Sequence, residues 1–231
     1  MNSALTKAIE LIFSGSEVLN NILSVTMKMS ISSSLVALLI GVPLGVLFGS
    51  NHFPGKRIIV VLNRTLMGLP PVVCGLLCFL MFCGVGPLGH LKLLYTIRGM
   101  VIAQIILITP IVIGSIEPHV NGIYPEIRET AMGLGIGRAK TIGLIMNESW
   151  YQIVSTYLLG FSRAIAEVGA VSMVGGNIQF KTRVMTTAIM LESNRGDFEK
   201  ALALGIILLL ISFDLGKWIL FSDIVFLYVI F

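Results

Sequence analysis

Long apolar runs separated by short polar stretches dominate the pattern along this chain. The runs are apolar on every face rather than alternating, which excludes the strands of a membrane barrel and favours helices in lipid. A membrane-spanning helix needs about 20 mostly apolar residues, because the hydrocarbon core is about 30 Å thick. Five windows approach that length: 29–48, extended back to 19, then 65–83, 99–116, 149–174 and 201–221. We therefore predict an all-α membrane protein with a bundle of about five transmembrane helices.

Both ends of the chain depart from this pattern. Apolar residues recur at helical spacing between positions 5 and 12, with Lys7 and Glu10 on the opposite face. We expect residues 1–18 to form an amphipathic helix in the membrane interface rather than a signal peptide, whose apolar region these charges would interrupt. The transmembrane domain is then 19–221. Residues 222–231 form an apolar tail that is too short to span the membrane alone.

The longest polar connection, residues 117–150, has helical periodicity of its own. Pro125 is well placed as the first residue of a helix. One apolar stripe follows at i, i+4 and i+7, formed by Ile127, Ala131 and Leu134. Glycines at 133, 135 and 137 interrupt the pattern before it resumes. We predict a helix, a glycine turn and a second helix outside the membrane, resting either on a partner or on lipid headgroups.

Composition agrees with a lipid environment. Hydrophobic residues make up 55% of the 231, and charged residues only 12%, whereas soluble domains carry about 25% charged residues. The mean hydropathy is +0.93. The net charge of +4 comes without basic runs or aromatic platforms, so nucleic acid is not an expected partner. Membrane lipid surrounds a multi-pass chain of this kind.

One pair of charges stands out within the fourth apolar window. Arg163 and Glu167 are four residues apart, so they share a face of a helix. A single charge at the bilayer centre costs about 2.5–3.5 kcal/mol. We therefore expect an intramembrane pair that faces the bundle interior or a pore. The alternative is that both side chains lie near the helix entry and reach water.

No catalytic, cofactor or metal site is predicted. The chain has no G-x-x-x-x-G-K-[ST] sequence, so ATP-driven transport would need a second subunit. The three histidines are far apart along the sequence. Cys74, Cys78 and Cys83 share one apolar stretch without a companion His or carboxylate, so helix packing is favoured over a metal at the first two.

Part of the polar connection resembles the EAA loop of ABC importer permeases. The family pattern is Glu-Ala-Ala, three residues, Gly, nine residues, Ile, one residue and Leu-Pro. Here the matching positions are Glu129-Thr130-Ala131, Gly135 and Ile145, and Asn147-Glu148 stands in place of Leu-Pro. Thr130 in place of the second residue of the pattern is a mild change in the first half of the loop, whereas the loss of Leu-Pro is a larger departure in the second half.

Further segments are similar to the oxyanion branch of these permeases, which includes sulfate, molybdate and tungstate permeases. They are Gly41-Val42-Pro43-Leu44-Gly45, Leu69-Pro70-Pro71-Val72-Val73-Cys74-Gly75 and Arg163-Ala164-Ile165-Ala166-Glu167-Val168-Gly169-Ala170. The stretch 174–178, followed by 182–189, is most similar to tungstate permeases. The resemblance covers about residues 19–210.

The resemblance implies a fold of the ABC importer type and a set of partners. Such permeases are homodimers in the cytoplasmic (inner) membrane, with a pore at the dimer interface. A separate ABC ATPase subunit hydrolyses ATP, and an extracytoplasmic oxyanion-binding protein delivers the anion. The loop would couple to the ATPase through Ile127, Glu129, Ala131, Leu134 and Gly135. Tungstate is the expected substrate, with molybdate or sulfate as the alternative.

The segment after the fourth window offers a path for such an anion. Conduction requires groups that attract the ion without holding it tightly. Cations combined with hydroxyls meet both demands, and an arginine presents a fork of donors to two oxygens at once. We expect the substrate path or gate to include Thr182, Arg183, Thr186 and Thr187. Alternatively, Arg183 pairs with Glu192 or Asp197, or contacts the binding protein.

Two other classes of membrane protein share the composition. A redox or enzyme subunit would need paired intramembrane histidines or a carboxylate cluster, and the sequence has neither. A secondary transporter usually has more helices and an internal repeat, which 231 residues barely allow. The sequence therefore favours a permease subunit.

Overall fold

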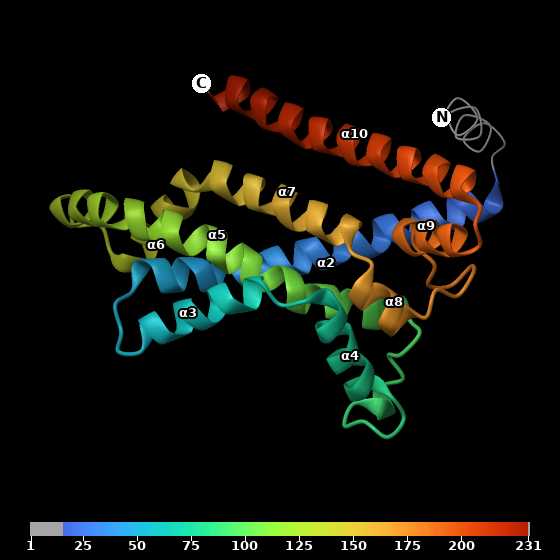
Figure 1. Ribbon diagram of the computed structural model, residues 1–231. Helices are drawn as coiled ribbons and strands as arrows, with labels where there is room; N and C mark the ends of the chain where they lie inside the picture. The colour runs from blue at the N-terminus through green and yellow to red at the C-terminus, as the bar shows by residue number, and fades with distance from the viewer. Residues whose placement is uncertain (1–15, 231) are drawn as a thin grey trace. The chain divides into compact units, whose positions relative to one another are not determined.

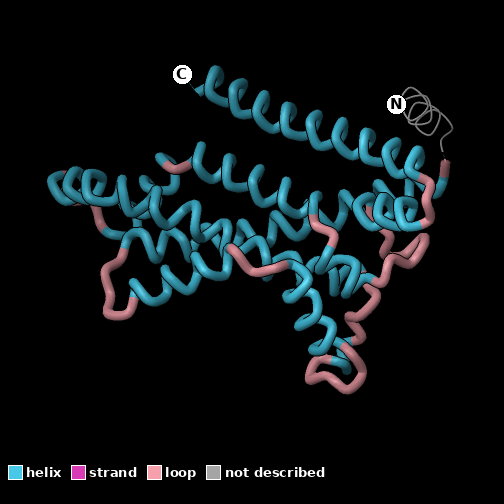
Figure 2. Tube along the Cα trace, in the orientation of Figure 1, coloured by secondary structure: helices cyan, strands magenta, loops and turns pink. Residues whose placement is uncertain are grey.

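The computed structural model describes residues 16–230, with side chains for residues 16–214 and for 217. Helices joined by loops make up these residues, without a strand among them (Figure 2). Labelled as in Figure 1, the elements are α2 (Glu17–Ser50), α3 (Lys56–Met67), α4 (Pro71–Phe82), the short 3-10 helix η1 (Gly89–Leu91), α5 (Ile97–Gly133), α6 (Arg138–Glu148), α7 (Trp150–Ala166), α8 (Gly169–Gly175), α9 (Met185–Asn194) and α10 (Phe198–Ile230). The expected all-α fold is confirmed. Of the expected interfacial segment 1–18, residues 1–15 lie outside the described part of the chain.

The chain divides into two compact units, each described by itself. Among the described residues the first comprises 16–32, 70–104 and 162–230, and the second comprises 33–69 and 105–161. The first unit contains α4, α8, α9 and α10, and the second contains α3 and α6. The long helices α2, α5 and α7 contribute residues to both units.

In the second unit, α2 and α5 approach closely along a row of glycines. A methyl group at Gly41, Gly45 or Gly49 would come within 2.6 to 2.7 Å of a side chain on α5. The facing side chains are, in the same order, Val112, Ile116 and Val120. Both rows repeat every four residues, so one face of each helix meets the other over more than two turns. Small residues allow this close approach of helices in lipid.

The first unit has a core built from several short helices. Helix α9 packs along the start of α10, and α4 packs along α8 (Figure 1). One apolar cluster joins α2, α9 and α10 through Leu19, Ile22, Met185, Ala188, Ala203, Leu204 and Ile207. A second cluster joins α2, α5, α8 and the residue before α9 through Val25, Met29, Met100, Val171 and Val184.

Two of the expected transmembrane helices are broken. The prediction of one helix over 65–83 is wrong, because α3 ends at Met67 and α4 begins at Pro71. Consecutive prolines at 70 and 71 remove backbone donors and force Pro70 into an extended conformation. The helix expected over 149–174 is likewise divided into α7 and α8.

The third expected helix is longer than its apolar window. Helix α5 continues from Ile97 through Pro110, Pro118 and Pro125 to Gly133. The prediction that Pro125 opens a new helix is therefore wrong. A proline at that position can begin a helix, but it can also be carried inside one at the cost of a backbone hydrogen bond. The glycine turn and the second helix, α6, follow as expected.

Helix length and hydropathy fit a membrane protein. Within the described residues, α2 and α5 are each long and apolar enough to cross a membrane. The pairs α3 with α4 and α7 with α8 would raise the number of candidate spans from two to four if each broken pair forms one span. Helix α10 extends well beyond the expected window 201–221, from Phe198 to Ile230.

Candidate functional site

Arg163 and Glu167 lie at the break between α7 and α8. Arg163 is in the last turn of α7, and Glu167 follows the last residue of that helix. Their charged groups are 3.5 Å apart, with side chains 40% and 4% exposed respectively. The expectation of neighbouring side chains agrees with this distance, but Glu167 lies in the break instead of within one continuous helix.

The buried carboxylate of Glu167 also holds the start of α8. Its Oε1 accepts a hydrogen bond from the backbone N–H of Ala170, over 3.2 Å. The hydroxyl of Thr186 donates to the backbone carbonyl of Glu167, over 2.9 Å. These bonds satisfy backbone groups that the interrupted helix would otherwise leave unpaired. Glu167 therefore joins α7, α8 and α9 at one point.

The three threonines expected in an anion path are engaged in local structure. Thr182 is buried, and its hydroxyl donates to the Gly175 carbonyl over 2.6 Å and accepts from the Ile178 N–H. Thr187 is also buried, and its hydroxyl caps the start of α9 by accepting from the Val184 N–H over 3.1 Å. With Thr186 bonded to Glu167, all three hydroxyls stabilise the segment between α8 and α9.

Arg183 is attached to the loop that follows α8. Its Nε donates to the Asn177 side-chain oxygen over 3.1 Å, and one Nη donates to the Asn177 carbonyl over 3.3 Å. The alternative partner Glu192 instead contacts Lys200 at 2.9 Å and Arg195 at 3.6 Å. The ion pair of Arg183 with Glu192 that the sequence allowed is therefore not formed.

These charges line a common cavity in the first unit. The cavity has a volume of about 320 Å³ and is lined by Arg183, Glu192, Arg195 and Lys200, with apolar residues of α2 and α10. Three cations and one carboxylate leave an excess of positive charge in the lining. Such a cavity can attract an anion. The periodicity of the sequence could not reveal it, because its charges come from two helices and from the segments before and after α9.

The loop between α5 and α6 closes through a glycine turn with defined geometry. Gly135 has a positive φ of 66°. The Ile136 N–H donates to the Ala131 carbonyl over 2.8 Å, and the Gly135 N–H donates to the Met132 carbonyl over 3.1 Å. These two bonds form the Schellman arrangement that ends helices at a left-handed residue. Gly135 therefore fixes the direction in which the chain leaves α5.

The apolar stripe expected to face a partner lines a groove beside this turn. Ile127, Ala131 and Leu134 share the groove with residues of α6, and its volume is about 340 Å³. Ala131 is buried at the bottom, whereas Leu134 is 70% exposed. Glu129 is exposed and does not line the groove. The structure thus brings three of the five expected coupling residues to one surface.

A further buried carboxylate, Glu117, directly follows the third apolar window. It lies in the second unit, with Lys56 and Arg64 of α3 each 3.9 Å away. Arg64 lies eight residues along α3 from Lys56, and the long side chains converge on one carboxylate. The isolated Glu117 at the end of an apolar window was a signal, but its partners follow only from the antiparallel course of α3 and α5.

The cysteines lie in α4 and at its end. Cys74 and Cys78 are buried in the first unit, and the Cys74 thiol lies 3.8 Å from the Ala103 carbonyl oxygen. Among the described residues, no three His, Cys, Asp or Glu side chains are grouped as a metal site.

Membrane-length helices, broken helices with buried charges, and a polar helix–turn–helix loop together define a membrane transport subunit. A comparison with protein families agrees, and it extends over most of the chain. The chain belongs to the family of binding-protein-dependent transport system inner membrane components, whose model matches residues 41–216. It is therefore the inner-membrane, non-catalytic component of an ABC transporter, which works with an ATPase and a binding protein.

Individual relatives are similar over most of their length. A tungstate uptake system permease protein, TupB, of Peptoclostridium acidaminophilum is 37% identical over 209 residues, covering 90% of this chain and 92% of the relative. A probable anion ABC transporter permease protein of Haloferax volcanii is 35% identical, covering 82% of this chain and 84% of the relative. A TupB of Campylobacter jejuni is 34% identical, covering 71% and 69%.

Proposed function

We propose that this chain is the permease through which tungstate enters the cell. The observation that carries the proposal is the similarity to a tungstate uptake permease along nearly the whole of both chains. The excess of cations around Arg183 adds physical support, because tungstate is a tetrahedral dianion that needs compensating charge. Molybdate and sulfate share this shape and charge, so they are the alternative substrates.

The proposal includes a homodimer with the pore between two copies. A single chain has two to four candidate spans in its described part, which is few for a closed pore. Many apolar side chains on α3 and α4 are exposed in the single chain, among them Ile58, Val61, Leu62, Val72 and Leu77. Lipid or a second copy would cover these side chains.

We assign coupling to the ATPase to the loop that ends α5. Ile127, Ala131 and Leu134 would form the apolar part of the surface that docks on the ATPase, in a groove whose lining also includes Glu126 and Glu148. Glu129, which lies near the end of α5, would face a basic group of the ATPase. Gly135 would hold the turn that gives the loop its shape. The open groove and the exposed Leu134 support this assignment.

We assign contact with the anion to Arg183 and a positioning role to Thr182, Thr186 and Thr187. The threonine hydroxyls hold the loop and the start of α9 in the contacts described above. Arg183 keeps donors beyond those used on Asn177, since a guanidinium has five N–H groups. Its neutral partner leaves its charge uncompensated, which suits transient contact with a dianion.

The experiment follows transport after reconstitution with the ATPase and the binding protein. We expect Arg183→Gln to slow tungstate uptake about tenfold or more, in line with the loss of a charge-assisted hydrogen bond. Arg183→Lys should restore uptake only in part, because lysine lacks the fork of donors. Binding-protein docking is measured in parallel. Normal docking with reduced uptake supports the assignment, whereas failed docking makes Arg183 a contact for the binding protein.

The same assay tests the substrate. Uptake of tungstate, molybdate and sulfate is compared with the native binding protein at equal concentrations. Tungstate should be carried preferentially. If sulfate is carried as well as tungstate, the tungstate assignment is wrong.

A further inference from the structure

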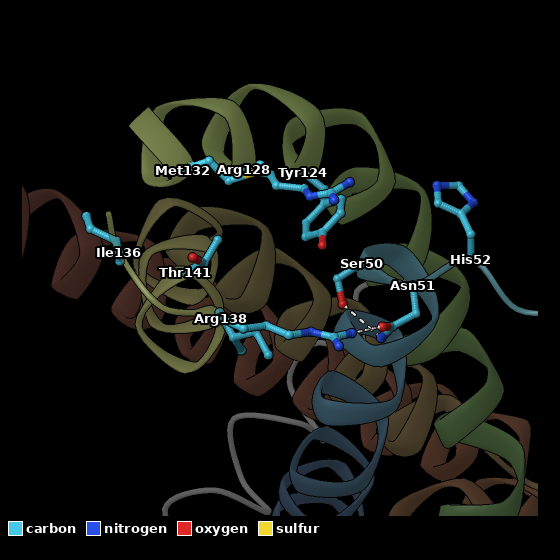
Figure 3. Close-up of a pocket in the computed structure, with 10 residues that line it drawn as sticks. Ser50, Asn51, His52, Tyr124, Arg128, Met132, Ile136, Arg138 and Thr141 are labelled. Carbon is cyan, nitrogen blue, oxygen red and sulfur yellow. Dashed lines mark hydrogen bonds between the residues drawn. The ribbon is translucent and has the colours of Figure 1, made fainter. Parts of the chain in front are cut away.

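A polar cavity in the second unit lies between the end of α2, the last turns of α5 and the first turn of α6 (Figure 3). Its volume is about 450 Å³. Figure 3 shows Tyr124 and Arg128 reaching in from α5, with Arg138 on the opposite side from α6 and Ser50 and Asn51 at the end of α2. None of the residues that line the cavity is an aspartate or a glutamate. Two arginines therefore give this lining a net positive charge.

Arg138 is held at the edge of the cavity by Asn51. One guanidinium nitrogen of Arg138 donates to the side-chain oxygen of Asn51. The amide nitrogen of Asn51 donates to the Leu47 carbonyl over 2.8 Å and to the Ser50 hydroxyl oxygen over 3.2 Å. Asn51 is thus bonded on both sides and orients Arg138. The remaining N–H groups of Arg138 are left for a ligand, since its side chain carries five.

Other donors at the cavity have no acceptor in the described part of the chain. Arg128 makes no ion pair or hydrogen bond there, although it lines the cavity and carries a full charge. The Ser50 hydroxyl accepts from Asn51, which leaves its proton free to donate. Tyr124 supplies a further hydroxyl from the same side as Arg128 (Figure 3).

The first turn of α6 borders the same cavity. Helix α6 has 11 residues, begins after Gly137 without a side-chain cap and has no acidic residue in its first turn. The first N–H groups of a helix have no intrahelical acceptor and carry partial positive charge. Arg138 and Thr141 of this turn line the cavity. The partial positive charge of a helix start favours an anion nearby, beside the two arginines.

We infer that this cavity is a binding site for a tetrahedral oxyanion group of the phosphate, sulfate or tungstate type. Arg128 and Arg138 bind it from opposite sides, with Ser50, Tyr124 and the first turn of α6 as further donors. The cavity has room for the anion and several waters, because each water takes about 30 Å³. The group is either a free inorganic anion or the phosphate of a lipid headgroup.

This site goes beyond the proposed transport function. Its residues belong to α2, α5 and α6, and none of them is in the segment 182–187 assigned to the anion path. Because it adjoins the loop assigned to coupling, an anion there would fasten α6 to the ends of α2 and α5. Anion binding at the cavity can be measured whether or not tungstate is the transported ion.

The experiment measures anion binding to the complex of permease and ATPase in discs of phosphatidylcholine. Sulfate, phosphate and tungstate are titrated by calorimetry at constant ionic strength, with chloride as the reference. We expect one saturable binding event per permease chain that weakens about tenfold or more in Arg128→Gln and in Arg138→Gln. Lys140→Gln is the matched control, because Lys140 lies in the same turn of α6 but does not line the cavity.

A second arm separates the sources of the anionic group. Short-chain phosphatidylglycerol that displaces sulfate identifies a lipid headgroup as a ligand, and a failure to displace it identifies a free anion.

Arg128→Gln removes no contact made in the structure, so its thermal midpoint without anion should equal that of the unchanged protein. Anion binding that is unchanged in both folded arginine variants overturns the inference. Weakened ATPase association without any anion binding also overturns it, since the arginines would then meet a carboxylate of the ATPase.

Discussion

At the scale of single residues, the two members of the ion pair at the α7–α8 break are in unequal environments. The Glu167 side chain is 4% exposed and that of Arg163 is 40% exposed. A buried carboxylate without a partner is costly, whereas an exposed guanidinium can still be hydrated. The unequal burial gives the two single substitutions different expected costs.

Arg163→Ala should destabilise the protein more than Glu167→Ala does. We expect a loss of about 2 kcal/mol for Arg163→Ala, less than the roughly 3–5 kcal/mol of a fully buried pair. The double variant should be more stable than Arg163→Ala, because no carboxylate is left uncompensated. Thermal unfolding in detergent and abundance in the membrane measure these differences. Strictly additive losses would show that the two side chains do not interact.

Gly135 is constrained by its backbone rather than by its surroundings. A methyl group there would meet no atom within 4 Å, but the φ of 66° is unfavourable for residues with a side chain. We expect Gly135→Val to reduce ATP-driven uptake several-fold with normal membrane abundance, because the turn must change. Gly135→Asn should retain most uptake, since asparagine adopts this conformation more readily.

Gly137 provides the matched control for this turn. It has a φ of −70° and open space around it, so Gly137→Ala should leave uptake unchanged. Equal losses in Gly135→Val and Gly137→Ala would mean that the loop tolerates no side chain for another reason, such as contact with the ATPase.

The sequence predicted some residue-scale features of the site and missed others. Four-residue spacing was enough to bring Arg163 and Glu167 together, because they are a helical turn apart. Spacing could not show that the hydroxyls of Thr182 and Thr187 are used by backbone groups. Their partners lie in loops or at the end of α8, where no periodic pattern describes the backbone conformation. The link between Arg138 and Asn51 spans 87 positions and depends on how α6 returns toward α2.

At the scale of elements, the close packing of α2 on α5 predicts opposite effects for a glycine-to-alanine substitution at a tight position and at an open one. Gly45→Ala would bring a methyl carbon to 2.7 Å from Ile116 and should cost about 1–3 kcal/mol through overpacking. Gly122→Ala on α5 meets no atom within 4 Å and should stabilise the helix by up to about 1 kcal/mol. Thermal midpoints in detergent should therefore shift in opposite directions. Shifts of the same sign would contradict this packing of α2 on α5.

Hydropathy predicted the kind of element better than the number or the limits of the elements. An average over a window is insensitive to the lack of backbone donors at Pro70 and Pro71, so it joined α3 to α4. It also stopped α5 at the first charged residues, because polar side chains outside the membrane lower the average. The helical backbone itself continues to Gly133. A hydropathy window thus indicates which part of a helix lies in lipid. Where the helix begins and ends depends instead on local hydrogen bonds.

At the scale of the whole molecule, the chain must obtain its energy from another subunit. We expect the purified permease to hydrolyse no ATP, because its sequence lacks a phosphate-binding loop. Addition of the ATPase should produce hydrolysis that the loaded binding protein stimulates. Phosphate release is measured with and without each subunit. Hydrolysis by the permease alone, in a preparation free of ATPase, would contradict the assignment.

The unbroken course of α5 has a mechanical consequence. From Pro118 to Gly133 the helix is about 22 Å long, at 1.5 Å per residue. Pro118 lacks the N–H that would close the turn before it, so it is a natural point of flexure. A tilt of about 10° there would swing the tip by about 4 Å. The polar half of α5 can thus act as a lever arm that turns a small rotation beside Glu117 into a side chain's width of travel at Gly135.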